Sequence, residues 1–128
     1  MTSVTLSILS DTFAVCRLDS HAQIPSWVTN HDLLSITRTA DELSIVCRQR
    51  DVPDGIRCER DWRCLKVAGP LDFALTGVLA SLTTPLADAV ISIFALSTFD
   101  TDYVLVKENN FQQALAVLQR AGHRILET

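Results

Sequence analysis

Hydrophobic and polar residues alternate along much of the N-terminal part of the chain, with the two-residue period of a β-strand. Residues 3–9 (SVTLSIL) alternate throughout, Ser10 and Asp11 interrupt the pattern, and residues 13–18 (FAVCRL) resume it. Two further β-rich runs lie within residues 33–48, on either side of a short polar segment, which is typical of a hairpin. The pattern predicts a strand-rich N-terminal part, with one strand ending before Ser10 and another beginning after Asp11.

The remainder of the chain combines strand-like and helix-like patterns in a definite order. Strand-like runs occupy residues 61–69, 91–97, 102–108 and 123–127. Between the first two runs, apolar residues recur at the spacing of an amphipathic helix: Leu75, Val78, Leu79, Leu82, Leu86, Ala89 and Val90. A second helix is expected to begin after Asn109 or Asn110 and to end at Gly122. The order β-α-β-β-α-β predicts an α+β, ferredoxin-like fold, in which two helices cover one face of a four-stranded antiparallel sheet.

Two details of the first helix can be predicted from its sequence. The helix is expected to start near Asp72, where unpaired backbone N–H groups would offer an anion site. Pro85 lies inside the apolar stripe and has no backbone donor. We therefore expect a kink or a new helix start at Pro85, with Thr84 as a candidate cap.

A weak internal repeat divides the chain into two parts. At an offset of about 60 positions, residues 36–46 and residues 96–106 share polar and apolar classes at most positions. This similarity predicts two tandem repeats: residues 1–60 would form a degenerate copy with shortened helices, and residues 61–128 a complete one. A second copy would also cover the sheet face that the helices leave open.

Composition and charge narrow the classes of function. Apolar residues make up 48% and charged residues 20% of the chain, as in globular proteins, and the net charge is −4. Basic residues form no pure patch, which disfavours nucleic acid and anionic membrane surfaces as partners. No apolar stretch approaches the ~20 residues needed to span a bilayer, and the first residues lack the charge pattern of a signal peptide. The expectation is a cytoplasmic protein.

Metal and catalytic chemistry have little support. The four cysteines show no C-x-x-C spacing, and no histidine lies at metal-ligand spacing from them, so they are expected to be reduced and structural. Asp100-Thr101-Asp102 supplies too few oxygen atoms for a hard cation. Cys64, between Arg63 and Lys66 along the chain, is the best candidate nucleophile. However, Arg63 is expected on the opposite face of the strand, so we expect neither an enzyme nor a cofactor.

The segment KVAGPLDFALTGVLASLTTPLADAVISIFALSTFDTDYVLVKE, residues 66–108, resembles the ACT domain, a family of amino-acid-sensing regulatory modules. It is similar to the regulatory domains of aspartate kinases and to CASTOR-type arginine sensors, and TRTADELSIVC at 37–47 is similar to their N-terminal repeat. The resemblance implies a non-catalytic protein that pairs into a homodimer and binds an amino acid between repeats. The positions that it implies for the ligand are Asp72, Leu75, Thr76, Val78, Thr98, Phe99, Asp100 and Asp102.

The residues themselves are compatible with a dipolar ligand. The helix start near Asp72 could hold a carboxylate, and Asp100 and Asp102 could hold an ammonium or guanidinium group. Each residue also has a structural alternative. Asp72 could be only a helix cap, Asp100 only a turn former, and Phe99 a core residue of the hairpin.

Two functions are therefore open at this point. The first is a regulatory sensor that binds an amino acid or a similar small metabolite. The second is an oligomerisation or interaction module that docks on a metabolic enzyme and has no ligand of its own. Thermal melting with each amino acid distinguishes the two, because a ligand stabilises the folded state that it binds.

Overall fold

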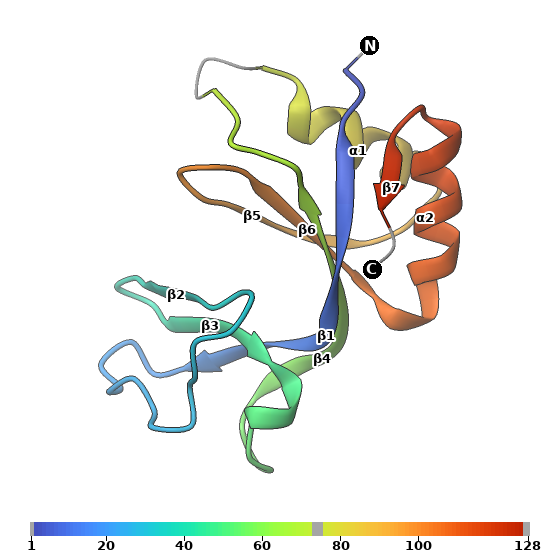
Figure 1. The fold of residues 1–128 in the computed structure, drawn as a ribbon. Coiled ribbons are helices and arrows are strands. Elements are labelled where there is room, and N and C mark those ends of the chain that lie inside the picture. Colours follow the sequence, from blue (N-terminus) through green and yellow to red (C-terminus); the bar gives the residue numbers. More distant parts are fainter. Residues whose placement is uncertain (1, 73–75, 127–128) are drawn as a thin grey trace. The chain divides into compact units, whose positions relative to one another are not determined.

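The computed structural model describes residues 2–72 and 76–126, which divide into two compact units. Unit 1 contains the described residues of 1–10 and 63–128, and unit 2 contains residues 11–62. Figure 1 shows the elements. The strands are β1 (Thr5–Leu18), β2 (Ser35–Arg38), β3 (Leu43–Arg48), β4 (Cys58–Val67), β5 (Ile93–Ser97), β6 (Asp102–Lys107) and β7 (Arg124–Leu126). The helices are α1 (Val78–Asp88) and α2 (Phe111–Arg120), with 3₁₀ turns η1 (Gln49–Asp51) and η2 (Glu108–Asn110).

Strand β1 is continuous, and the predicted break at Ser10 and Asp11 is wrong. Instead, the division between the units falls between these two residues. Because β1 lies beside β4 in the sheet order, the ladder keeps the backbone extended through two residues of low strand propensity. The polar pair therefore marks the point where β1 passes from one unit to the other.

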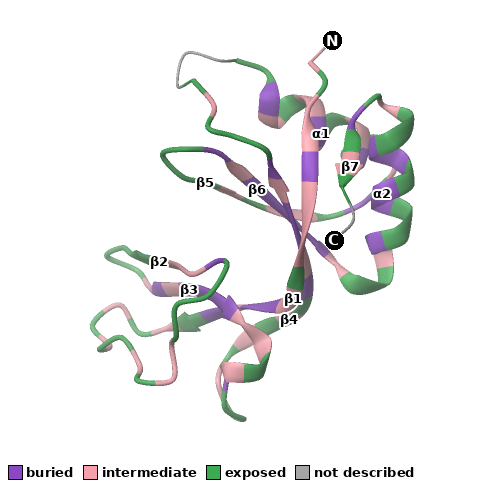
Figure 2. Ribbon diagram, viewed as in Figure 1, coloured by how far each residue is buried: buried purple, intermediate pink, exposed green. Residues whose placement is uncertain are grey.

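Unit 1 has the predicted βαββαβ order, formed by β4, α1, β5, β6, α2 and β7. The ferredoxin-like fold is therefore confirmed. The start of β1 was predicted as a strand, but its place in this sheet was not: it lies between β7 and β4 and pairs in parallel with β7. The apolar core joins the sheet to both helices, and buried residues recur along α2 in Figure 2. Its fully buried members include Leu65, Val67, Leu82, Leu86 and Val106.

Helix α1 runs without interruption through Pro85, so the predicted restart is wrong. A proline at this position removes the N–H that would bond the carbonyl of Ser81. The Nε2 atom of His123 lies 2.9 Å from that carbonyl oxygen, and the Val4 N–H donates to Nδ1 of the same ring at 3.2 Å. Because Nδ1 accepts, Nε2 carries the proton and donates. His123 is buried, and its side chain completes the hydrogen bonding of the helix.

Unit 2 is built from strands and the turn η1, with no α-helix anywhere in residues 11–62. β2 and β3 form the predicted hairpin, in which the Thr39 N–H donates to the carbonyl of Glu42. A small core contains Cys16, Leu43 and Ile45. The interpretation of residues 1–60 as a degenerate repeat stays a prediction, although residues up to Ser10 pack with unit 1.

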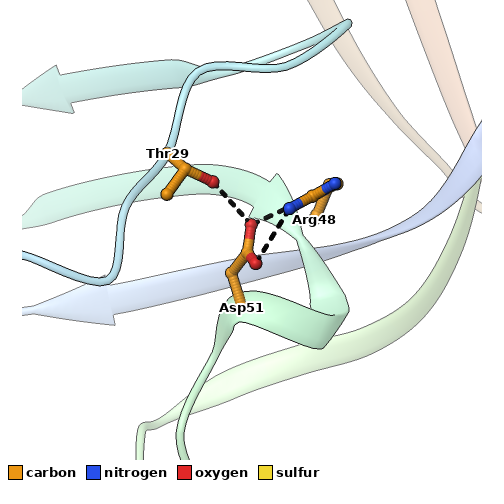
Figure 3. Close-up of polar contacts among 3 residues, drawn as sticks. All are labelled: Thr29, Arg48 and Asp51. Atoms are coloured by element: carbon orange, nitrogen blue, oxygen red, sulfur yellow. Dashed lines mark hydrogen bonds and ion pairs between the residues drawn. The ribbon is translucent and has the colours of Figure 1, made fainter.

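Polar contacts fix the end of β3 (Figure 3). The Arg48 guanidinium donates to both carboxylate oxygens of Asp51, at 3.0 and 3.1 Å, and the Thr29 hydroxyl donates to one of them at 2.8 Å. These hydrogen bonds, those from Arg48 first, hold the pKa of Asp51 below its ordinary value. They anchor η1 to β3 and to the loop that contains Thr29.

Candidate functional site

The β5–β6 hairpin has a tightly bonded polar tip. The strands pair as far as Ser97 and Asp102, and the turn between them is closed by the Thr98 N–H, which donates to the Thr101 carbonyl at 2.9 Å. The Thr98 hydroxyl donates to the same carbonyl at 3.1 Å, and the Ser97 hydroxyl donates to the Asp102 carboxylate at 2.6 Å. The Ser97 and Thr98 hydroxyl groups therefore form hydrogen bonds within the hairpin tip.

Two hydrogen bonds join this tip to the segment that follows β4. The Leu71 N–H donates to the carbonyl of Asp100 at 2.7 Å. The buried Thr101 hydroxyl donates to the carbonyl of Val67 at 2.6 Å. Gly69 allows this approach, because a Cβ atom there would lie 3.1 Å from the Asp100 carbonyl oxygen. The segment after Pro70 and the acidic hairpin, which lie about thirty residues apart in the sequence, are therefore neighbours in space.

A cavity of about 210 Å³ lies where these segments meet. Its lining includes six of the residues predicted for the ligand site: Asp72, Val78, Thr98, Phe99, Asp100 and Asp102. Leu71, Ser97 and Thr101 complete the lining. Of the other predicted positions, Leu75 lies outside the described residues. Thr76 is exposed and is not among the described residues that line this cavity.

The predicted helix start near Asp72 is wrong. Helix α1 begins at Val78, after Gly77, whose φ of 81° is left-handed. A glycine adopts this conformation without strain, which explains why it interrupts the apolar stripe. Asp72 therefore does not cap α1, and the helix N-terminus meets the cavity at Val78 instead.

The acidic side chains give the cavity a negative lining. Asp72, Asp100 and Asp102 all contribute to it, and no lysine or arginine is among its described lining residues. Phe99 is 77% exposed, so the alternative that it is a core residue of the hairpin is wrong. A lining of this charge suits a cationic guest, because hydrogen bonds between carboxylates and ammonium or guanidinium groups are among the strong ones.

A second cavity, of about 230 Å³, shares part of the hairpin tip with the first. Thr98, Asp100 and Thr101 line both cavities, and the second is completed by Lys66, Gly69, Pro70 and Tyr103. Lys66 and Tyr103 were not among the residues predicted for the site. Strand alternation contained the signal for Lys66, since its neighbours Leu65 and Val67 both point into the core beside the helices.

The described residues give no support to the catalytic and metal alternatives. Cys64 is fully buried, and burial raises the pKa of its thiol to about 12. A thiol of this kind is poorly suited to act as a nucleophile at neutral pH. Within residues 2–72 and 76–126, no group of three or more histidine, cysteine, aspartate or glutamate side chains is arranged to hold a metal ion.

Comparison with known proteins identifies the family. The family model of the ACT domain matches residues 57–120, half of the chain, and these residues include the hairpin and all the described lining residues of both cavities. This chain belongs to the ACT domain family. A second family model, which describes an N-terminal domain, matches residues 11–55 of this ACT protein, close to the bounds of unit 2.

Solved structures agree with this assignment. A crystal structure of an Agobacterium tumefaciens protein has a TM-score of 0.94 and 38% identity, and the match covers 100% of this ACT protein and 96% of that chain. The regulatory subunit of aspartate kinase from Thermus flavus has a TM-score of 0.63, with 94% of this chain and 99% of that chain covered. Its identity is 12%, so it shows a shared fold alone.

A human relative is similar over a shorter stretch. The cytosolic arginine sensor for mTORC1 subunit 1 is 42% identical over 60 residues, which is 46% of this chain. The matched stretch is 18% of the length of that relative. The name of that relative describes a sensor.

Proposed function

We propose that this ACT protein is a non-catalytic regulatory protein that binds an amino acid, or a similar small metabolite, beside the tip of the β5–β6 hairpin. One observation carries the proposal. The hydrogen bond from the Leu71 N–H to the Asp100 carbonyl brings Asp72, Asp100 and Asp102 around a single cavity.

The size and charge of that cavity favour a small cationic guest. Its volume of about 210 Å³ is smaller than the ~300–1,000 Å³ of sites for drug-sized ligands. A hydrogen bond between a carboxylate and a cationic group contributes ~1.5–3 kcal/mol. Because a relative is named as an arginine sensor, L-arginine is the first ligand to test.

A second copy of the chain would complete the site, as expected for a ligand held between ACT repeats. The cavity is lined entirely from unit 1, and Phe99 in its lining is exposed, so a second copy could contact the ligand in a homodimer.

We place the homodimer in the cytoplasm, and the name of the human relative describes a cytosolic protein. No helix in the described part of the chain is long and apolar enough to cross a membrane. Analytical ultracentrifugation with and without L-arginine tests the assembly.

Thermal unfolding with each of the twenty amino acids at millimolar concentration tests the proposed function. A ligand at 100 times its Kd adds ~2.7 kcal/mol to the free energy of unfolding, which raises the midpoint by several degrees for a chain of this size. Asp100→Asn should reduce that rise. Asp54→Asn makes the same charge change on an exposed residue of unit 2 and should leave the ligand-induced rise in the unfolding midpoint unchanged.

The second candidate is an interaction module that docks on an enzyme and binds no small ligand. Its support is the exposure of two large apolar side chains of unit 1, Val90 at 90% and Phe99 at 77%. If none of the twenty amino acids raises the unfolding midpoint, the sensor proposal fails and the docking module takes its place.

A further inference from the structure

We infer that Lys66 is the carboxylate receptor of this site, so that the protein selects ligands with a free carboxylate and an adjacent ammonium group. The inference deepens the proposed function and rests on it. In this arrangement, the α-carboxylate and α-ammonium groups of the amino acid bind in the second cavity. The side chain of the amino acid binds in the first, acidic cavity.

The position of Lys66 on β4 is the first step. Leu65 and Val67 belong to the core with the helices, so strand alternation places Lys66 on the opposite face of the sheet. Lys66 is half-buried there and lines the second cavity together with Tyr103 of β6. In the part of the chain that the structure describes, no hydrogen bond or ion pair engages its ammonium group.

The second step is the opposite charge in the same cavity. Asp100 lines this cavity too, and its carboxylate makes no hydrogen bond or ion pair with the described residues. Two opposite charges that line one cavity without contacting each other leave room for a guest between them. A zwitterion has the complementary pair, since its carboxylate suits Lys66 and its ammonium suits Asp100.

The third step connects the two cavities. Thr98, Asp100 and Thr101 line both, so a ligand whose head lies between Lys66 and Asp100 can extend around the hairpin tip. The first cavity then offers Asp102 and Asp72 to a cationic side chain. Lys66 is the positive charge of the second cavity, whereas the N-terminus of α1 meets the first cavity at Val78.

This arrangement makes a specific demand on the ligand. An amine that lacks the carboxylate loses its partner at Lys66 and leaves a half-buried ammonium group unpaired. Such an amine should therefore bind weakly, even when its side chain is identical to that of the amino acid. A variant without the positive charge of Lys66 should no longer bind the amino acid more tightly than the corresponding amine.

Isothermal titration calorimetry tests the inference with three amino acids and their decarboxylated analogues: L-arginine with agmatine, L-lysine with cadaverine, and L-leucine with isopentylamine. For an amino acid that binds, we expect wild-type affinity at least tenfold above that of its analogue. Lys66→Met should weaken the amino acid at least tenfold and remove the difference, while Lys66→Arg should retain most of it. Arg50→Gln removes an exposed positive charge of unit 2 and serves as the matched control.

The outcomes separate this inference from the proposed function. An amino acid that binds Lys66→Met as tightly as wild type overturns the role of Lys66 and leaves the sensor function standing. Equal binding of an amino acid and its analogue by wild type does the same. If none of the twenty amino acids raises the unfolding midpoint of wild type, the sensor function and this inference fail together. The unfolding midpoints of the unliganded variants show whether each variant is folded.

Discussion

Val90 occupies a backbone position that usually belongs to glycine. Its φ is 60°, and the bonds from the Val90 N–H to the Ala87 carbonyl and from the Ile91 N–H to the Leu86 carbonyl form a Schellman motif after α1. Gly122 holds the corresponding position after α2, with a φ of 98°. A β-branched residue is strained in this conformation, and Val90 is 90% exposed, so burial does not offset the strain.

Replacing Val90 with glycine should therefore stabilise the protein. The left-handed conformation costs an L-residue roughly 1–2 kcal/mol, and the greater freedom of glycine in the unfolded chain offsets part of that gain. We expect Val90→Gly to raise the free energy of unfolding by about 0.5–1 kcal/mol in urea titrations. The reciprocal variant, Gly122→Val, should lower it. A Val90→Gly protein that is less stable than wild type would show that the Val90 side chain has contacts that offset its strain.

His123 and Pro85 form a second residue-scale pair, linked through the Ser81 carbonyl. Pro85→Ala restores the N–H that this carbonyl lacks. His123→Ala should cost about 2–3 kcal/mol in the wild-type background, because it leaves the Ser81 carbonyl and the Val4 N–H without partners. In the Pro85→Ala background the cost should fall by about 1 kcal/mol. Urea titrations of the four proteins measure this coupling, and strictly additive effects would contradict the link.

At the scale of elements, Asp51 ties η1 to β3 and to Thr29. The pKa of Asp51 is lowered in the folded protein, chiefly by Arg48. Its contribution to stability is therefore complete above the unfolded pKa, ~3.9. That contribution is lost as the pH falls through the lower folded value. Asp51→Asn should melt below wild type at pH 7, and the difference should narrow below about pH 4. A difference that is constant from pH 7 to pH 3 would contradict this account.

The elements also show how far the sequence could predict the fold. Periodicity identified α2 because one face of the helix is buried and the other is polar. The β5–β6 hairpin was identified by two apolar runs on either side of a polar turn. Periodicity placed the start of α1 too early, because Leu75 continues the apolar stripe in the sequence. The helix begins after Gly77, which adopts a left-handed φ. Periodicity divided β1 because local propensity does not include the ladder bonds of neighbouring strands.

At the scale of the whole molecule, the site depends on contacts between distant parts of the sequence. Resemblance and residue chemistry indicated Asp72, Asp100 and Asp102, and the structure brings these three around one cavity. Strand alternation could have placed Lys66 on the face opposite the core, but its meeting with Tyr103 depends on β4 and β6 being neighbours in the sheet, which no local pattern contains. The bonds of Leu71 and Thr101 were likewise invisible in the sequence, although they hold the cavity together.

The central claim is that a small amino acid binds where the hairpin tip meets the segment after β4. The most direct test is a two-dimensional ¹H–¹⁵N NMR titration of the full chain with an equimolar mixture of the twenty amino acids, in wild type and in Asp100→Asn. The account predicts that the amide signals of Gly69, Leu71 and Thr98–Asp102 shift in wild type and shift less in the variant. Signals that stay unchanged there, or that shift only in unit 2, would contradict it.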